Sequence, residues 1–313
     1  MMFGYIIRRL GGAIPTLFVV VLISFLMVHM TPGDPFATER ALPPEVLKQL
    51  HHQYHLDLPL WKQFFYYIND LLHGNLGYSY KYQGQSINQL VFPDGGQGGF
   101  WVSVQLGIFS IILASIFGII FGIFSALTRN TKLSFVDHII GVIAMLFIST
   151  PIVVTAPLAV LIFAVILGLF PAGGWGSWND LVLPVIVLAI PYIAIITQIT
   201  RSSLIEILSS PFIRTAKAKG LSMPRIVWKH ALKPSLMPVV SFLGPAVAGI
   251  LTGSVVVETV FTIPGIGVQV VQGATNRDYN LVLALTIIYS LLVILFNLVV
   301  DIVYAFLDPK IRY

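Results

Sequence analysis

The histidines of one short segment have a spacing that could bind a metal ion. In HHQYH, His51 and His55 are four residues apart, so a helix would place both on one face. The metalloprotease motif H-E-x-x-H also needs a glutamate between its histidines, and no glutamate stands there. The surrounding region is also rich in aromatic residues, and we expect it to be exposed. We therefore expect solvent-facing histidines and no metal site.

Nucleophilic and phosphate-binding patterns are also missing from the sequence. Serines occur in or beside apolar stretches, but none has a histidine and an aspartate at a recognisable spacing, and such hydroxyls commonly join helices in bilayers. The segment DGGQGG lacks the lysine and hydroxyl of a phosphate loop. The chain has no cysteine, which excludes disulfides and thiolate metal sites. We expect no catalytic residue and no cofactor on this chain, so any ATP hydrolysis must occur on another.

Charge is concentrated in one segment, Phe212–Pro234, with the sequence FIRTAKAKGLSMPRIVWKHALKP. Only 10% of the chain is charged, yet this segment holds six of its 18 basic residues and no acidic residue. The local sequence predicts a helix that ends at Gly220, because glycine takes the left-handed conformation that closes helices. Ser222 and Pro224 predict the start of a second helix. Three of its basic residues would share a face: Arg225, Lys229 and Lys233.

Three functions are alternatives for this helix–glycine–helix segment. A basic helix is attracted to anionic lipid by about 1 kcal/mol per residue. A DNA-binding helix must enter the major groove. A segment that is anchored in a membrane at both ends is poorly placed to do so. Docking of a partner protein is the third function, and the small residues Ala216, Ala218 and Gly220 favour it because they permit close backbone approach. The residues alone leave lipid and docking open.

The elements that carry this segment are membrane-spanning helices. The chain is 57% hydrophobic, against roughly 45–50% for soluble domains, and its mean hydropathy is +0.88. A spanning helix needs about 20 apolar residues. Six stretches qualify, and they predict an all-α polytopic membrane protein with six transmembrane helices: Leu10–Met30, Phe100–Leu127, Ile139–Phe170, Leu181–Thr200, Val239–Val257 and Leu281–Val300. The third contains Pro151 and Pro157, so we expect it to be kinked, tilted or extended beyond the bilayer; the fourth contains Pro184 and Pro191.

The distribution of lysine and arginine predicts the orientation. Thirteen of these 18 residues fall in segments that share one side with both termini. The positive-inside rule makes that side cytoplasmic. The 31–99 segment then lies outside, and its apolar spacing predicts two helices, the second ending near Gly74.

An ion-coupled transporter is the main alternative from a different class. Ion coupling usually leaves ionisable residues inside the membrane, whereas here His29, His138, Glu258 and Asp301 all lie near span ends. Glu258 could meet a peptide amine at the outer mouth, or it could be an interfacial residue bonded to the following loop.

Several segments together resemble the permeases of binding-protein-dependent ABC importers. Phe212–Pro234 is similar to their cytoplasmic EAA loop, which fits a cleft on the ATPase, and RTAKAKG with HAL resembles the peptide-transporter branch. Segments along the rest of the chain resemble the oligopeptide-permease B subunits: RRLGGAIPTLFVVVLISFLMVHMTPGDP, PFATERALPPEV, LLHGNLGYSYKY, GSVVVETVFTIPGIG, NRDYNLV and DPKIRY. The closing Leu-Pro of the general loop is displaced here to Leu232 and Pro234.

The resemblance implies a type I ABC importer permease fold with a helical extracytoplasmic insertion after the first helix. It implies divisions at 1–99, 100–305 (with a coupling loop at about 201–238) and 306–313. The implied function is ATP-driven oligopeptide import across the bacterial inner membrane; dipeptide, glutathione or nickel import is the alternative within the family. The implied partners are a second permease subunit, two cytoplasmic ATPases, a periplasmic peptide-binding protein, the peptide and lipid, but no nucleic acid. The coupling-loop residues are Arg214, Thr215, Ala216, Lys217, Gly220, Leu221, His230, Leu232 and Pro234, and the pathway or outer-gate candidates are Glu258, Thr259, Pro264 and Gly265.

Overall fold

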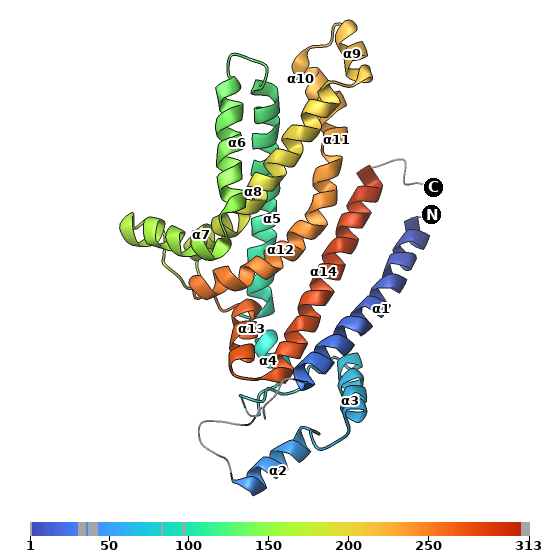
Figure 1. Cartoon of the computed structure of the whole chain (residues 1–313), viewed down its shortest axis with the longest axis vertical. Coiled ribbons are helices and arrows are strands. Elements are labelled where there is room, and N and C mark those ends of the chain that lie inside the picture. Colours follow the sequence, from blue (N-terminus) through green and yellow to red (C-terminus); the bar gives the residue numbers. More distant parts are fainter. Residues whose placement is uncertain (1, 31–35, 37–42, 83, 96–97, 308–313) are drawn as a thin grey trace. The chain divides into compact units, whose positions relative to one another are not determined.

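The computed structural model describes residues 2–30, 36, 43–82, 84–95 and 98–307, and it is built from helices (Figure 1). It divides into two compact units. Of the described residues, one unit holds 2–9, 103–263 and 293–307, and the other holds 10–102 and 264–292. We call these the bundle unit and the insertion unit, and each is described by itself. The signature PFATERALPPEV lies largely outside the described residues, and DPKIRY wholly so.

Among the described residues, five helices have the length and apolar composition to cross a membrane, or up to six if one bent pair is a single span. The pair is α6 (Ser134–Ser149) followed by α7 (Ile152–Ala159), which continues into the π-helix η1 (Val160–Ile166). These elements confirm the predicted all-helical membrane fold. The five single helices are α1 (Met2–His29), α5 (Phe100–Thr128), α8 (Trp178–Leu208), α12 (Met237–Val260) and α14 (Tyr279–Leu307).

The bend in the third predicted span is sharp, at 105°. It falls where Pro151 follows Thr150, whose backbone is extended at φ −94° and ψ 118°. Proline disfavours the helical conformation of the preceding residue, which explains a break at this place. Pro184 and Pro191, by contrast, lie inside the continuous α8.

The core of the bundle unit surrounds α8, which packs against α6 and α12. Its contact with α5 is very close because α5 presents Gly118 and Gly122, four residues apart. A Cβ atom added at Gly118 would lie 2.7 Å from the Cβ of Ile196, and one at Gly122 would lie 2.8 Å from the Thr197 carbonyl oxygen. Small residues at this spacing let transmembrane helices approach closely.

The insertion unit contains the helices predicted after the first span, which confirms the helical insertion. They are α2 (Pro44–Gln53) and α3 (Leu60–Leu72), with Gly74 at φ 74° just beyond. The short α4 (Ile87–Val91) and α13 (Ile266–Thr275) belong to the same unit. An aromatic cluster packs α2 onto the segment after α3: the rings of Phe36, Tyr54 and Tyr80 lie 5.0 to 5.4 Å apart, centroid to centroid.

Candidate functional site

The basic segment forms a compact loop between α8 and α12. It consists of α9 (Pro211–Ala218), α10 (Met223–Ile226), the π-helix η2 (Val227–Ala231) and α11 (Leu232–Ser235). We call residues 209–236 the basic loop. Figure 1 shows it at one end of the bundle unit, where α8 ends and α12 begins.

A glycine closes the first helix of the basic loop, as the sequence predicts. Gly220 has φ +74°, and its N–H donates to the Lys217 carbonyl at 2.9 Å. The Leu221 N–H donates to the Ala216 carbonyl at 3.3 Å. These two bonds form the Schellman motif, which satisfies carbonyls that the helix end leaves free. The chain can then reverse into α10 in four residues.

The inner face of the basic loop is apolar and packs on the ends of α5 and α8. One buried cluster joins four residues of the loop to Ala126 of α5 and Leu204 of α8: Ile213, Ala216, Ile226 and Ala231. Leu221 packs against this cluster. Burying an aliphatic side chain contributes about 1.5–3 kcal/mol. The loop is therefore packed firmly against the bundle and is not a loose connection between helices.

The outer face of the basic loop combines positive charge with exposed apolar side chains. Arg214, Thr215, Lys217 and Gly220 are all exposed. Trp228 is 69% exposed, and Phe212 and Met223 are also exposed. A large exposed indole among cationic side chains is typical of a binding surface, because water solvates it poorly. Ala216, by contrast, faces inward and is buried in the apolar cluster.

The second half of the basic loop is wound as a π-helix. Pro234 has no N–H and its ring crowds the carbonyl four residues back, that of His230. The wider turns of η2 end at Ala231, directly after that carbonyl. His230, Leu232 and Pro234 are half-buried, while the predicted basic face of Arg225, Lys229 and Lys233 is exposed. The basic face is therefore exposed even though the helix that carries it is irregular.

An ion pair lies near the base of the loop, and the sequence reasoning missed it. Arg201 of α8 donates to both carboxylate oxygens of Asp137 in α6, through Nε at 2.5 Å and through a terminal nitrogen at 2.7 Å. Ser125 of α5 donates to the same carboxylate. Three helices are thereby joined by one buried carboxylate. A signal was present, because the predicted alternation of spans puts both charged residues at the same side of the membrane.

The pathway candidates divide between the two units. In the bundle unit Glu258 is fully buried, and the Ser103 hydroxyl of α5 donates to its carboxylate at 2.7 Å. Thr259 is exposed, and its hydroxyl donates to the Val255 carbonyl of its own helix at 2.7 Å. The buried carboxylate of Glu258 is thus held between α12 and α5 rather than presented at a surface.

In the insertion unit, Pro264 and Gly265 lie against the glycine-rich joint. The Gly99 N–H donates to the Pro264 carbonyl at 2.7 Å, and Gly99 and Gly265 form an isolated β-bridge. Pro264 is exposed and Gly265 is buried at the start of α13. This contact joins the end of the insertion to the segment before α13.

Asp278 fastens the insertion to the segment before α14. It is buried, and it accepts hydrogen bonds from the Ser79 hydroxyl and from the Tyr80 N–H, the latter at 3.0 Å. Burial and the nearby Asp278 raise the pKa of the Tyr80 hydroxyl above its usual value of 10.0. Two of the sequence signatures, LLHGNLGYSYKY and NRDYNLV, meet at this carboxylate.

The histidine pair does not share a helix. Helix α2 ends at Gln53, and His55 lies beyond it with φ +59°, its ring stacked on that of Tyr66 at 5.1 Å. His51 instead contacts the ring of Phe36. The described residues contain no cluster of three or more metal-ligating side chains.

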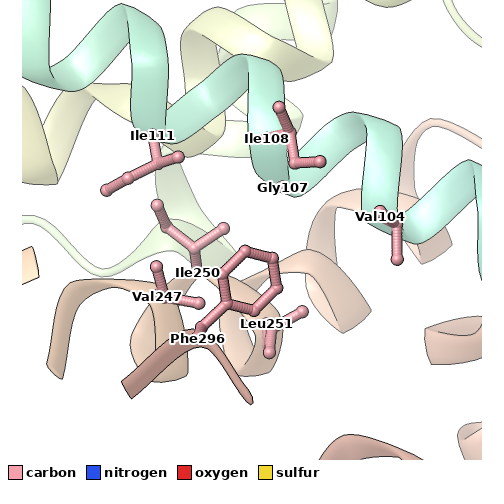
Figure 2. A pocket seen from close by; sticks show the side chains of 8 residues that line it. All are labelled: Val104, Gly107, Ile108, Ile111, Val247, Ile250, Leu251 and Phe296. Carbon is pink, nitrogen blue, oxygen red and sulfur yellow. The ribbon is translucent and has the colours of Figure 1, made fainter. Parts of the chain in front are cut away.

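A small apolar cavity lies inside the bundle unit, between α5, α12 and the last turns of α14 (Figure 2). Its volume is about 20 Å³. Gly107, Ile250 and Phe296 line it with five other apolar residues, and Figure 2 shows their side chains converging. The lining offers no charged or hydroxyl group, so this cavity could not coordinate an ion.

Comparison with known proteins agrees with these features. Residues 118–313 match the family model "Binding-protein-dependent transport system inner membrane component", and residues 2–86 match its N-terminal companion. The chain is 49% identical to the oligopeptide transport system permease protein OppB of Haemophilus influenzae and 50% identical to that of Escherichia coli K12, each over the full length of both chains. It is 40% identical to the dipeptide transport system permease protein DppB of Lactococcus lactis, over 99% of this chain and all of that protein.

The fold also resembles a solved transporter. The inward-facing methionine ABC transporter MetNI has a chain that aligns with a TM-score of 0.54 at 19% identity, covering 67% of this chain and 94% of that one. At this identity the likeness shows the fold alone. With the two family models and the full-length relatives, it leads to one conclusion: this chain belongs to the family of inner membrane components of binding-protein-dependent transport systems.

Proposed function

We propose that this chain is the permease subunit of an ATP-driven importer that moves oligopeptides across the bacterial inner membrane. Relatives named for oligopeptide transport are 49–50% identical over the full length. Relatives named for dipeptide transport are 40–41% identical. The difference in identity favours longer peptides over dipeptides.

The basic loop is the element that we assign to energy coupling. One observation carries this assignment: the loop is two-faced, with an apolar inner face packed on α5 and α8 and an exposed outer face that is cationic and aromatic. A loop that is attracted only to lipid does not need an inner face packed firmly on the bundle. A loop that receives force needs one, because a push on its outer face must move α8 and α12 as a unit.

The proposed mechanism follows from the packing of the loop on α5 and α8. One of the two ATPase subunits binds the outer face around Arg214, Thr215, Lys217 and Gly220 on the cytoplasmic side, where both chain termini also lie. Closure of the ATPases on ATP rotates the loop, and α8 transmits the motion to the bundle. A homologous second permease forms the other half of the pathway, and a binding protein delivers peptide at the opposite side.

The outer end of the pathway is assigned to the turn after α12. Thr259 is exposed in the last turn of α12, Pro264 is exposed after it, and Gly265 is the N-cap residue of α13. The bond from Ser103 to Glu258 supports a role in holding that turn. In this proposal Glu258 positions the gate and does not bind the peptide amine.

Uptake by the reconstituted transporter tests the function. Proteoliposomes that contain this chain with its second permease and ATPases receive a radiolabelled pentapeptide and binding protein outside, with ATP inside. We expect uptake that stops when ATP is replaced by ADP and that continues when a protonophore collapses the proton gradient. Uptake that a protonophore abolishes while ATP remains would favour an ion-coupled transporter. Competition by unlabelled dipeptide, glutathione or nickel identifies the cargo within the family.

A further inference from the structure

Helix α3 exposes an apolar stripe along one side. Trp61, Phe65 and Leu72 are 60%, 66% and 80% exposed, and the half-buried Ile68 lies between them. Their spacing of four, three and four residues places all four on one helix face. We call these four residues the outer stripe. Such a continuous apolar face is unfavourable in water, so it indicates a partner of apolar character.

A second apolar sector of α3 packs on α1. The ring of Phe64 lies 5.2 Å from that of Phe25 and 6.0 Å from that of Phe18. Tyr67 lies 6.1 Å from Phe25, which is almost wholly buried. Helix α3 and the part of α1 from Leu10 onward belong to the insertion unit, and Figure 1 shows α3 beside the C-terminal part of α1.

These contacts fix the depth of α3 relative to the membrane. The span of α1 is Gly11–His29, 19 residues, which at 1.5 Å per residue is about the thickness of the hydrocarbon core. Phe25 and Phe18 therefore lie roughly 6 Å and 16 Å from the end of that span, measured along the helix. Helix α3 thus packs against a part of α1 inside the bilayer, and its uncovered apolar side faces the same medium as α1.

The remaining sector of α3 is polar. Lys62, Tyr66 and Asp70 are exposed and spaced four residues apart, and at 100° per residue they lie opposite the combined apolar sectors. A helix with a polar face opposite Trp, Phe and Leu lies in the membrane plane, its apolar face buried about 5–10 Å into the boundary between headgroups and acyl chains. Indole and phenol rings are enriched at this boundary.

We propose that the outer stripe of α3 inserts into the lipid leaflet in which α1 ends. The argument for lipid is continuity: Phe18 of α1 is itself half exposed and touches Phe64, so the apolar surface runs unbroken from a spanning helix onto α3. Helix α3 then anchors the insertion at a fixed height on the membrane. This inference depends on α1 crossing the bilayer and not on the identity of the cargo.

Spin labelling tests the insertion directly, because the chain has no cysteine to remove. Phe65→Cys in the outer stripe and Asp70→Cys in the polar sector, about 140° apart around one helix, form a matched pair. Each is labelled with a nitroxide in the complete transporter, reconstituted into phosphatidylethanolamine–phosphatidylglycerol vesicles. Frequent collisions of the nitroxide with oxygen indicate that it lies in lipid. Frequent collisions with a water-soluble nickel chelate indicate that it lies in water. We expect a several-fold higher ratio of oxygen to nickel accessibility at position 65 than at position 70.

Two results would overturn the proposal. Equal and high nickel accessibility at both positions places the stripe in water. A label at position 65 that is shielded from both reagents places it in a protein interface, with the second permease or the binding protein as occupant. Trp61→Cys in the outer stripe and Tyr66→Cys in the polar sector repeat the comparison nearer the start of the helix, so that one perturbed position cannot decide the result.

Discussion

Substitutions at Gly220 separate the shape of the basic loop from the surface that it presents. Its φ of +74° is strained for other residues, and no atom lies within 4 Å of an added Cβ. The strain costs roughly 1–2 kcal/mol. The fully buried Leu204, Ile213 and Ile226 hold the loop in place, and at about 1.5–3 kcal/mol each they outweigh that cost severalfold. The loop should therefore keep its form in Gly220→Asn and in Gly220→Trp.

The two variants should nevertheless differ in transport. Asparagine tolerates the left-handed conformation and is small, so Gly220→Asn should retain most of the ATP-dependent uptake. Tryptophan projects a large ring from the outer face, so Gly220→Trp should abolish uptake while the subunit remains in the membrane. The assay is peptide uptake per copy of membrane-inserted subunit. Normal uptake by Gly220→Trp, or equal loss in both variants, would refute docking at this surface.

Ala218→Trp is a second probe of the same surface, because Ala218 is exposed and lies in a helix; Ala216→Arg is unsuitable, since a buried charge at that position would also unseat the loop. Asp137→Asn should lower the thermal stability of the purified complex, because it leaves Arg201 without its carboxylate; Arg201→Gln added to it should restore part of the loss if the ion pair is the cause. Gly122→Ala should also destabilise, by about 1–3 kcal/mol, since an added Cβ meets Thr200 at 2.5 Å. Gly141→Ala is its control, because nothing lies within 4 Å there, and equal melting temperatures for the two would contradict the close packing of α5 on α8. Asp278→Asn should make the insertion more sensitive to protease by weakening its bonds to Ser79 and Tyr80, whereas the exposed Asp70→Asn should not; identical digestion would show that Asp278 does not hold the insertion.

The features that the sequence could predict were local ones. Apolar length located the spans, helical spacing located α2 and α3, and the chemistry of glycine located the turn at Gly220. The inward orientation of Ala216 also had a local signal, since Ile213 and Ala216 are three residues apart on one apolar face. The small residues Ala216, Ala218 and Gly220 predicted a common contact surface for a partner, but Ala216 is buried in the apolar cluster.

The features that escaped prediction join distant parts of the chain. Asp137 and Arg201 are 64 residues apart, and Ser79 and Asp278 are 199 apart. No periodicity encodes such a pair, because it depends on how the helices pack. The sharp bend before Pro151 is similar: proline favoured a break there, but its angle depends on the neighbouring helices.

Crosslinking from the outer face of the basic loop tests the coupling assignment most directly. A photoreactive label on Ala218→Cys in the assembled transporter, followed by mass spectrometry, identifies the neighbour of that face. We expect a covalent adduct with the ATPase subunit. A label that reacts only with phospholipid, while the ATPases remain bound elsewhere in an active complex, would contradict the account.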